Sequence, residues 1–154
     1  MIIRIVEGSM IMNNISVVYA TKTQHSKKLA EAIGKELNIE AKNISEYPQL
    51  QKASLFFLVG GIYAGKSNSE LLSYAEKLDA SIASKVVLVT SSVSTSHRTQ
   101  RDIRALLVEK GIDVVDEITC TGALLFVKLG HPNKKEIQAV AERAKDISKR
   151  VMEV

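Results

Sequence analysis

Short apolar runs alternate along the chain with segments whose apolar residues recur at helical spacing. The runs at 15–20, 55–59 and 85–90 are rich in β-branched and other apolar residues, a pattern typical of strands buried inside an α/β fold. Residues 39–44 alternate apolar with polar residues, which predicts a half-exposed edge strand. A last and longer strand region is expected at 114–127, with an interruption at Gly122.

The segments between and after these runs place their apolar residues on one face, which predicts amphipathic helices laid on a sheet. The first covers 27–37, a second follows the run at 55–59, a third closes at Gly111, and a last one occupies the end of the chain. Two of these helices are preceded by the spacing of a capping box, at Ser67 with Glu70 and at Asn133 with Glu136.

This alternation predicts an α/β, three-layer doubly wound fold with a five-stranded parallel sheet, because right-handed crossovers place helices on both of its faces. We expect one such domain at 14–154. Residues 1–13 are then an N-terminal extension or a lead-in to the first strand, since Met10 and Met12 are both plausible starts.

Three loops of similar chemistry follow the predicted strands, at 21–26, 60–67 and 91–97. Each is rich in Gly, Ser or Thr, and none contains Asp or Glu. Ligands of doubly wound folds bind beyond the carboxyl ends of the strands, so three such loops at equivalent places favour a shared anionic ligand. The alternative is that all three are simply polar loops with helix caps.

The first loop has the chemistry of a phosphate site. It leads into a predicted helix, whose first N–H groups lack internal partners and whose dipole favours negative charge. Thr21, Thr23 and Ser26 add hydroxyl donors, and Lys22 and His25 add or can add positive charge. The alternative is that these hydroxyls only cap the helix.

Composition narrows the classes of function. With 154 residues, 45% of them apolar and 25% charged, the chain matches an ordinary globular domain. The net charge of +4 is spread through every helix without interleaved aromatic residues, so we expect no nucleic-acid partner, and no apolar run is long enough for a membrane span. The single Cys120 excludes an internal disulfide and fits a reducing cytoplasm.

Candidates for other chemistry are weak. His25, His97 and His131 lie in three separate segments without metal-ligand spacing, and Cys120 lies in an apolar strand context that favours an inert buried thiol. Ser92 and His97 have no Gly-x-Ser-x-Gly elbow around them, so a serine hydrolase is not expected.

Together these segments resemble the flavodoxin-like family of FMN-binding proteins. The segment 15–37 resembles the family's opening strand, phosphate loop and helix, 57–66 is similar to its second loop, 90–97 to its third, and 130–136 to the turn before its last helix. The resemblance covers about 15–150 and implies the strand order 2-1-3-4-5.

The resemblance also implies a site for FMN. The phosphate would be held by Thr21, Thr23, Gln24, His25 and Ser26. The isoalloxazine ring would be flanked by Ile62, Tyr63 and Ala64, and its pyrimidine edge bordered by Ser91, Ser92, Val93 and Ser94. A single phosphate loop without a Gly-x-Gly-x-x-Gly turn favours FMN over FAD or a nicotinamide dinucleotide.

Two features depart from the family pattern. The Trp that often stacks on the flavin is missing, because the chain contains no Trp. Gln24 replaces the usual Gly, which would cost roughly 1–2 kcal/mol if the position needs a positive φ. We expect instead that Gln24 has helical geometry and that its side chain reaches the phosphate, so that Gln24→Gly weakens FMN binding.

The leading hypothesis is a flavoprotein that mediates electron transfer and needs no catalytic side chain, since the flavin supplies the chemistry. One alternative is a flavodoxin-fold oxidoreductase of the quinone reductase or protoporphyrinogen oxidase type. Another is a flavin-free interaction module. The loops carry Lys22, Lys66 and, at the edge, Arg98, but no carboxylate. These positive charges predict a flavin hydroquinone that forms easily and an acidic redox partner protein. We expect the protein to be a monomer or a weak homodimer.

Overall fold

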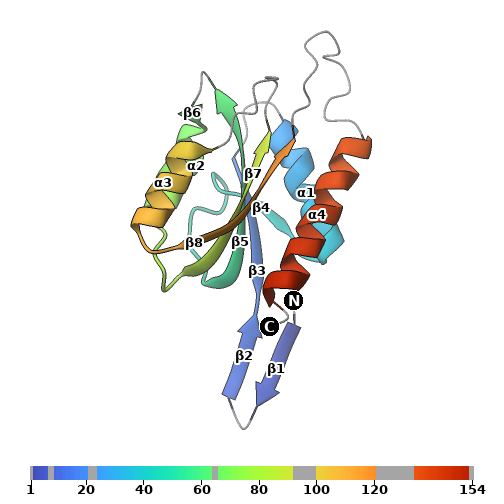
Figure 1. Cartoon of the computed structure of the whole chain (residues 1–154), viewed down its shortest axis with the longest axis vertical. Helices are drawn as coiled ribbons and strands as arrows, with labels where there is room; N and C mark the ends of the chain where they lie inside the picture. The colour runs from blue at the N-terminus through green and yellow to red at the C-terminus, as the bar shows by residue number, and fades with distance from the viewer. Residues whose placement is uncertain are drawn as a thin grey trace.

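The computed structural model describes residues 2–6, 9–20, 24–63, 66–91, 100–120 and 134–152. Within these ranges, parallel strands form one sheet in the spatial order β4-β3-β5-β7-β8 (Figure 1). Their bounds are β3 (Ile15–Tyr19), β4 (Ala41–Asn43), β5 (Ala53–Tyr63), β7 (Ala83–Ser91) and β8 (Asp113–Cys120). Counted along the chain from β3, this is the predicted order 2-1-3-4-5, which is confirmed.

The helices cover the two faces of this sheet. Helices α1 (His25–Leu37) and α4 (Lys134–Met152) pack on one face, and α2 (Ser69–Lys77) and α3 (Arg101–Glu109) pack on the other (Figure 1). Successive side chains of β5 point to opposite faces of the sheet, so they contribute in turn to the hydrophobic core on each face. Phe56 and Leu58 pack with α2 and α3, whereas Phe57 packs with α1 and α4.

The central position of β5 follows from its sequence. Residues 55–59 are 0% exposed, because helices cover both faces and β3 and β7 cover both edges. Burying a large apolar side chain stabilises the fold by about 1.5–3 kcal/mol, so an uninterrupted apolar run belongs at this place in the sheet. The edge strand β4 is half-buried throughout, as its alternating pattern predicts.

The starts of two helices differ from the sequence-based expectation. Helix α1 begins at His25, two residues earlier than predicted. The capping box at Ser67 is wrong, because the N-cap of α2 is Asn68, whose Oδ1 accepts hydrogen bonds from the N–H groups of Glu70 (2.9 Å) and Leu71 (3.2 Å). The expected strand beyond Cys120 and the Asn133 cap lie outside the described residues.

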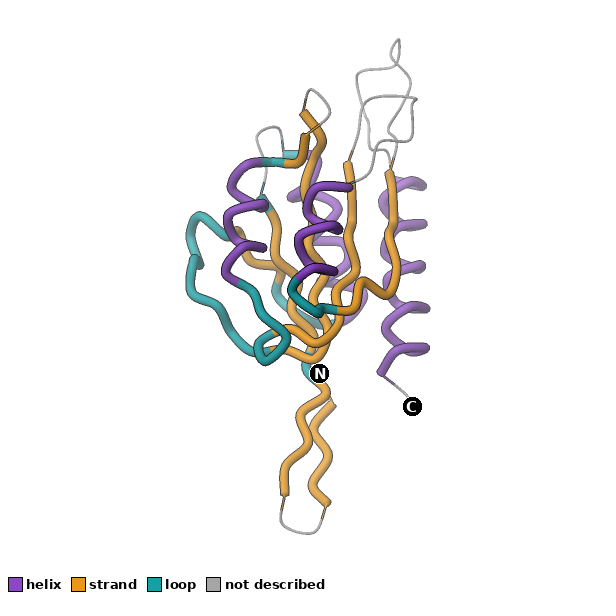
Figure 2. Tube along the Cα trace, turned by 60° about the vertical axis from the view of Figure 1, so that its left-hand side comes forward, coloured by secondary structure: helices purple, strands orange, loops and turns teal. Residues whose placement is uncertain are grey.

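Residues before β3 form a separate two-stranded antiparallel sheet of β1 (Ile2–Val6) and β2 (Ser9–Asn13), which projects from the body of the protein (Figures 1 and 2). It joins the main sheet through Asn14, whose Nδ2 donates to the Lys52 carbonyl (2.8 Å) and whose Oδ1 accepts from the Ser54 N–H (3.2 Å). That 14–154 forms the functional domain stays a prediction.

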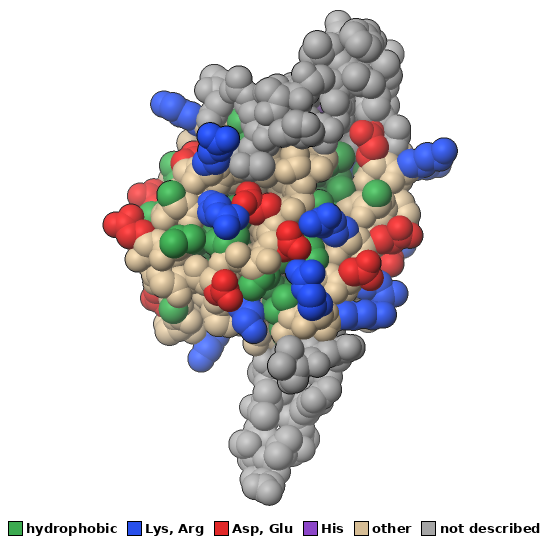
Figure 3. Space-filling view, in the orientation of Figure 1, with side chains coloured by type: hydrophobic (Ala, Val, Ile, Leu, Met, Phe, Trp, Pro, Cys, Tyr) green, Lys and Arg blue, Asp and Glu red, His purple; other side chains and the backbone are tan. Residues whose placement is uncertain are grey.

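None of the helices in the described ranges is both long and apolar enough to cross a bilayer. On the face shown in Figure 3, Lys and Arg side chains are interspersed with Asp and Glu rather than gathered in one patch.

Candidate functional site

The carboxyl ends of three parallel strands meet at one edge of the sheet. Tyr19 at the end of β3 pairs with Val59 of β5, and further along β5 Gly61 pairs with Ser91 at the end of β7. The segments that follow these strands therefore begin side by side. This is the place where doubly wound folds bind ligands, and it lies where the sequence predicts it.

The structure describes part of the predicted site. Gln24, His25 and Ser26 lie at the start of α1, Ile62 lies near the end of β5, and Ser91 ends β7. Tyr63 is described as the last residue of β5 by its backbone alone. The remaining predicted residues lie outside the described ranges: Thr21, Thr23, Ala64, Ser92, Val93 and Ser94.

The start of α1 offers backbone N–H groups to an anion. Its first internal hydrogen bond runs from the Lys28 N–H to the Gln24 carbonyl (3.0 Å), so the N–H groups of residues 25–27 have no partner within the helix. No acidic residue occupies the first turn, and Ser26 is buried there. The positive end of the helix dipole is thus not offset by a carboxylate of its own first turn.

Gln24 does not have the geometry expected from the sequence. Its backbone has φ 75° and ψ −11°, in the left-handed region, and its side chain makes no capping hydrogen bond to α1. The helical-geometry interpretation is therefore wrong, and the backbone strain that a Gly would avoid is present here. Gln24 is the N-cap residue, directly before the first helical residue His25, so it need not share the helical geometry of α1.

Two glycines near the end of β5 allow close packing against α2. Gly60 and Gly61 belong to β5 itself, which continues past the predicted end at Val59. A Cβ on Gly60 would lie 2.5 Å from Leu71 Cδ2, so a larger residue would force the buried Leu71 side chain of α2 to move. The expectation that a loop begins at residue 60 is therefore wrong for these two glycines.

The segment after β5 turns back on itself. Strand β6 (Lys66–Ser67) pairs antiparallel with the end of β5, Ile62 with Ser67 and Tyr63 with Lys66. The N–H of the next residue, Asn68, donates to the Gly61 carbonyl (3.1 Å) and fixes the start of α2 against β5. This short hairpin replaces the helix cap that the sequence suggested at Ser67.

A carboxylate of helix α3 reaches this hairpin. Asp102 in the first turn of α3 accepts hydrogen bonds from the N–H of Ser67 (3.1 Å) and from its Oγ (2.5 Å). Burial raises the pKa of the Asp102 carboxyl, but the bonds from Ser67 and from the Ile103 N–H lower it, and the pKa lies below its usual 3.8. Sequence analysis missed this residue, because Asp102 is 35 positions from Ser67.

Two buried amides at the same end of the sheet each leave one polar atom without a hydrogen-bond partner. Gln100, the N-cap residue of α3, donates from Nε2 to the Val89 carbonyl (2.9 Å) and to Thr90 Oγ1 (3.2 Å). Among the residues that the structure describes, Gln100 Oε1 and Asn68 Nδ2 are buried and unpaired. Buried groups of this kind are uncommon and suggest a partner other than the neighbouring side chains.

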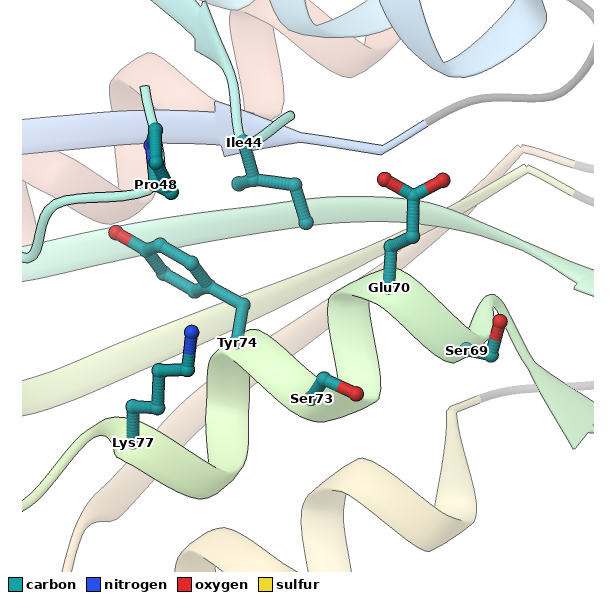
Figure 4. Close-up of a pocket in the computed structure, with 7 residues that line it drawn as sticks. All are labelled: Ile44, Pro48, Ser69, Glu70, Ser73, Tyr74 and Lys77. Carbon is teal, nitrogen blue, oxygen red and sulfur yellow. The ribbon is translucent and has the colours of Figure 1, made fainter. Parts of the chain in front are cut away.

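A separate pocket of about 280 Å³ lies along α2, between this helix and the segment that follows β4 (Figure 4). The ring of Tyr74 extends from α2 toward Pro48 and Ile44, and burial raises the pKa of Tyr74 to about 12. None of the predicted ligand-binding residues lines this pocket, and its two charged residues, Glu70 and Lys77, lie at opposite ends of it (Figure 4). It is therefore not the predicted site.

Comparison with known proteins identifies the class. A family model described as a flavodoxin domain matches residues 16–150, so the chain belongs to the flavodoxin domain family. The fold matches a solved flavodoxin from the domain Archaea with 17% identity and a TM-score of 0.63, over 89% of this chain and 97% of that one. No curated protein matched the chain.

Two further solved structures share the fold. Oxidised flavodoxin 2 from Bacillus cereus has 15% identity and a TM-score of 0.60, with 88% of this chain and 98% of that one covered. An NAD(P)H:quinone oxidoreductase from Methanothermobacter marburgensis has 8% identity and a TM-score of 0.55, with 86% and 94% covered. At these low identities the likenesses support the fold alone. Any function has to be argued from this chain's own residues in the first and second loops.

Proposed function

We propose that this chain is an FMN-binding flavoprotein that transfers electrons to or from a partner protein in the cytoplasm. The observation that carries the proposal is the alignment of the ends of β3, β5 and β7, with the open helix start of α1 beside them. Membership of the flavodoxin domain family supports it further.

The start of α1 fits the phosphate of FMN. The backbone N–H groups of residues 25–27, the Ser26 side chain and the hydroxyls of Thr21 and Thr23 would hold it, and no carboxylate of the first turn opposes it. FMN suits this site better than FAD, because the chain offers a single phosphate loop at the end of β3.

The polar groups near the ends of β5 and β7 fit the ring. A flavin pyrimidine presents both carbonyl oxygens and an N–H group, which a hydroxyl such as that of Ser91 at the end of β7 can complement. Ile62, Tyr63 and Ala64 would flank the isoalloxazine, and Ser91 to Ser94 would border its edge. The flavin, when bound, accepts or gives one or two electrons.

The protein's own residues then bind, orient and shield the cofactor, and none has to act as an acid, a base or a nucleophile. Cys120 is buried at the end of β8, consistent with a structural role. A substrate-specific oxidoreductase would need added segments to build a substrate pocket, which argues for electron transfer to a protein. Lys66 in the exposed part of β6 supports an acidic partner.

The positive φ of Gln24 favours a second candidate, a flavodoxin-fold interaction module that binds no flavin. The strain at this position costs roughly 1–2 kcal/mol, and no Trp is present to add stacking energy. A protein that has lost its cofactor could tolerate both features.

The test is to purify the protein without added flavin, record its visible spectrum, and titrate the flavin-free protein with FMN, riboflavin and FAD. We expect a yellow protein that binds FMN much more tightly than riboflavin. Ser26→Ala should weaken FMN binding by about tenfold or more and leave riboflavin binding unchanged, since a hydrogen bond to a charged group contributes about 1.5–3 kcal/mol.

Ser148→Ala is the matched control, because Ser148 is also a buried helical serine and its Oγ donates to the Lys145 carbonyl (2.8 Å) of α4. It should change neither affinity. A colourless protein that cannot be reconstituted with FMN would reject the proposal and leave the interaction module, and equal affinities for FMN and riboflavin would reject the phosphate role of the first loop.

A further inference from the structure

Hydrogen bonds connect the segment after β5 to the segment after β7. Asp102 accepts from the Ser67 N–H through Oδ2 and from the Ser67 Oγ through Oδ1, and Ser67 is buried. Ser67 in turn pairs with Ile62, which is one of the residues predicted to flank the ring. A single carboxylate of α3 therefore holds the returning strand of the β5–β6 hairpin.

The other end of this connection is also fixed. Gln100, two residues before Asp102, is fully buried and donates to the Val89 carbonyl and to Thr90 Oγ1 near the end of β7. The Asp102 carboxylate is held on its own helix by the Ile103 N–H (2.9 Å). The side chains of Gln100 and Asp102 thus link β7, α3, β6 and β5 in one continuous path.

We infer that Asp102 is a positioning residue, which holds β6 and the end of β5 against α3 and thereby maintains the half of the site that receives the flavin ring. A carboxylate suits this role, because only an ionised carboxyl accepts at both oxygens, and its bonds to N–H and O–H donors are stronger than those between neutral groups. The holding contact does not depend on any ligand, whereas its effect on flavin binding rests on the proposed function.

The chain contains a matched control for this contact. Asp79, in the turn before β7, also accepts from the N–H (2.9 Å) and the Oγ (2.5 Å) of one serine, Ser81, but takes both bonds on a single oxygen, Oδ1. This second pair stabilises the turn between α2 and β7 and lies at the end of the sheet opposite the ring site. Ser67→Ala and Ser81→Ala each remove one hydroxyl donor to a carboxylate, but only the Ser67 pair lies beside the proposed ligand.

The experiment compares Asp102→Asn and Ser67→Ala with Asp79→Asn and Ser81→Ala. Asparagine cannot accept at both terminal atoms, so Asp102→Asn loses at least one of the bonds made by the carboxylate. We expect it to weaken FMN and riboflavin binding by the same factor, about tenfold, which corresponds to ~1.4 kcal/mol. Ser67→Ala should weaken both by a smaller common factor, and the two control variants should leave both affinities unchanged.

Amide hydrogen exchange of the flavin-free proteins gives a second measurement. Exchange in residues 60–67 should be faster in Asp102→Asn than in the unmodified protein and unchanged in Asp79→Asn. Unchanged exchange in Asp102→Asn would overturn the positioning role, whether or not flavin binds. Faster exchange with unaltered flavin affinity would overturn the link to the ring site, and failure of the unmodified protein to bind flavin would instead reject the proposed function.

Discussion

Backbone strain at Gln24 gives the sharpest test of how the chain enters α1. Gln24 is one of two non-glycine residues at positive φ in the described part of the chain, the other being Asn38 at the C-cap of the same helix. Replacing Gln24 by Gly removes a steric cost of roughly 1–2 kcal/mol in this geometry. Part of the gain is lost, because Gly adds about 0.4–1 kcal/mol of conformational entropy to the unfolded chain.

The net stabilisation expected for Gln24→Gly is therefore about 0.5–1 kcal/mol, or roughly 1–4 °C in melting temperature for a domain of this size. Gln24→Ala serves as the control, because it removes the same side chain but keeps the Cβ that causes the strain. The Gly variant should be more stable than the Ala variant by about 1 kcal/mol. Urea unfolding of both proteins, with equal slopes, measures this difference.

Flavin titration extends the same comparison to function. The Gly variant should bind FMN more tightly than both the unmodified protein and the Ala variant, whereas the sequence alone suggested that Gln24→Gly weakens binding relative to the unmodified protein. Asn38→Gly and Asn38→Ala repeat the backbone comparison at φ 60°, at the far end of α1, and should leave FMN affinity unchanged. If Gln24→Gly and Gln24→Ala were equally stable, the left-handed geometry of Gln24 would not carry the cost assigned to it.

Two further predictions concern charge. Lys66→Glu should lower the potential of the semiquinone–hydroquinone couple by about tens of millivolts at low salt and by less at high salt, since a unit charge at roughly 8–10 Å and an effective dielectric near 20 contributes on the order of 2 kcal/mol before screening. An unchanged potential at low ionic strength would refute this role of Lys66. The pKa values of Asp79, Asp102 and Asp116 all lie below 3.8 in the folded protein, so the unfolded chain binds more protons at low pH. Their stabilisation is present above that value and is lost as the pH falls through the lowered pKa values, and urea unfolding at about pH 3 should give a smaller free energy of unfolding than at about pH 6.

The strands could be predicted from the sequence where their burial permits only one kind of residue at each position. The run at 55–59 must be apolar at every position because both faces are covered, and the alternation at 39–44 reflects an edge. The alignment of the three strand ends follows from parallel topology alone, which is why the place of the site could be predicted before its geometry.

The N-cap of α2 was predicted wrongly because it depends on contacts between residues far apart in the sequence. Ser67 and Asn68 are both acceptable N-cap residues, and the choice between them was decided by Asp102 and by pairing with β5, neither of which is visible in the local sequence. The three loops contain no carboxylate of their own, but Asp102 of α3 reaches Ser67, which the local sequence could not indicate. At Gln24, the assumption of helical geometry was reasonable for the residue type, but Gln24 is the N-cap of α1 and its backbone lies in the left-handed region.

The two edge strands of the parallel sheet also bear on how this protein avoids unwanted association. An exposed strand edge is a template for pairing with another chain, and short length, charge and irregular register are the usual protections. Edge strand β4 has three residues with Lys42 at its centre, while β8 carries Asp116 and Glu117 where its register with β7 shifts between Val86 and Val87. Each edge strand thus has features that oppose pairing with a strand of another chain, so the sheet can keep two unpaired edges without aggregating.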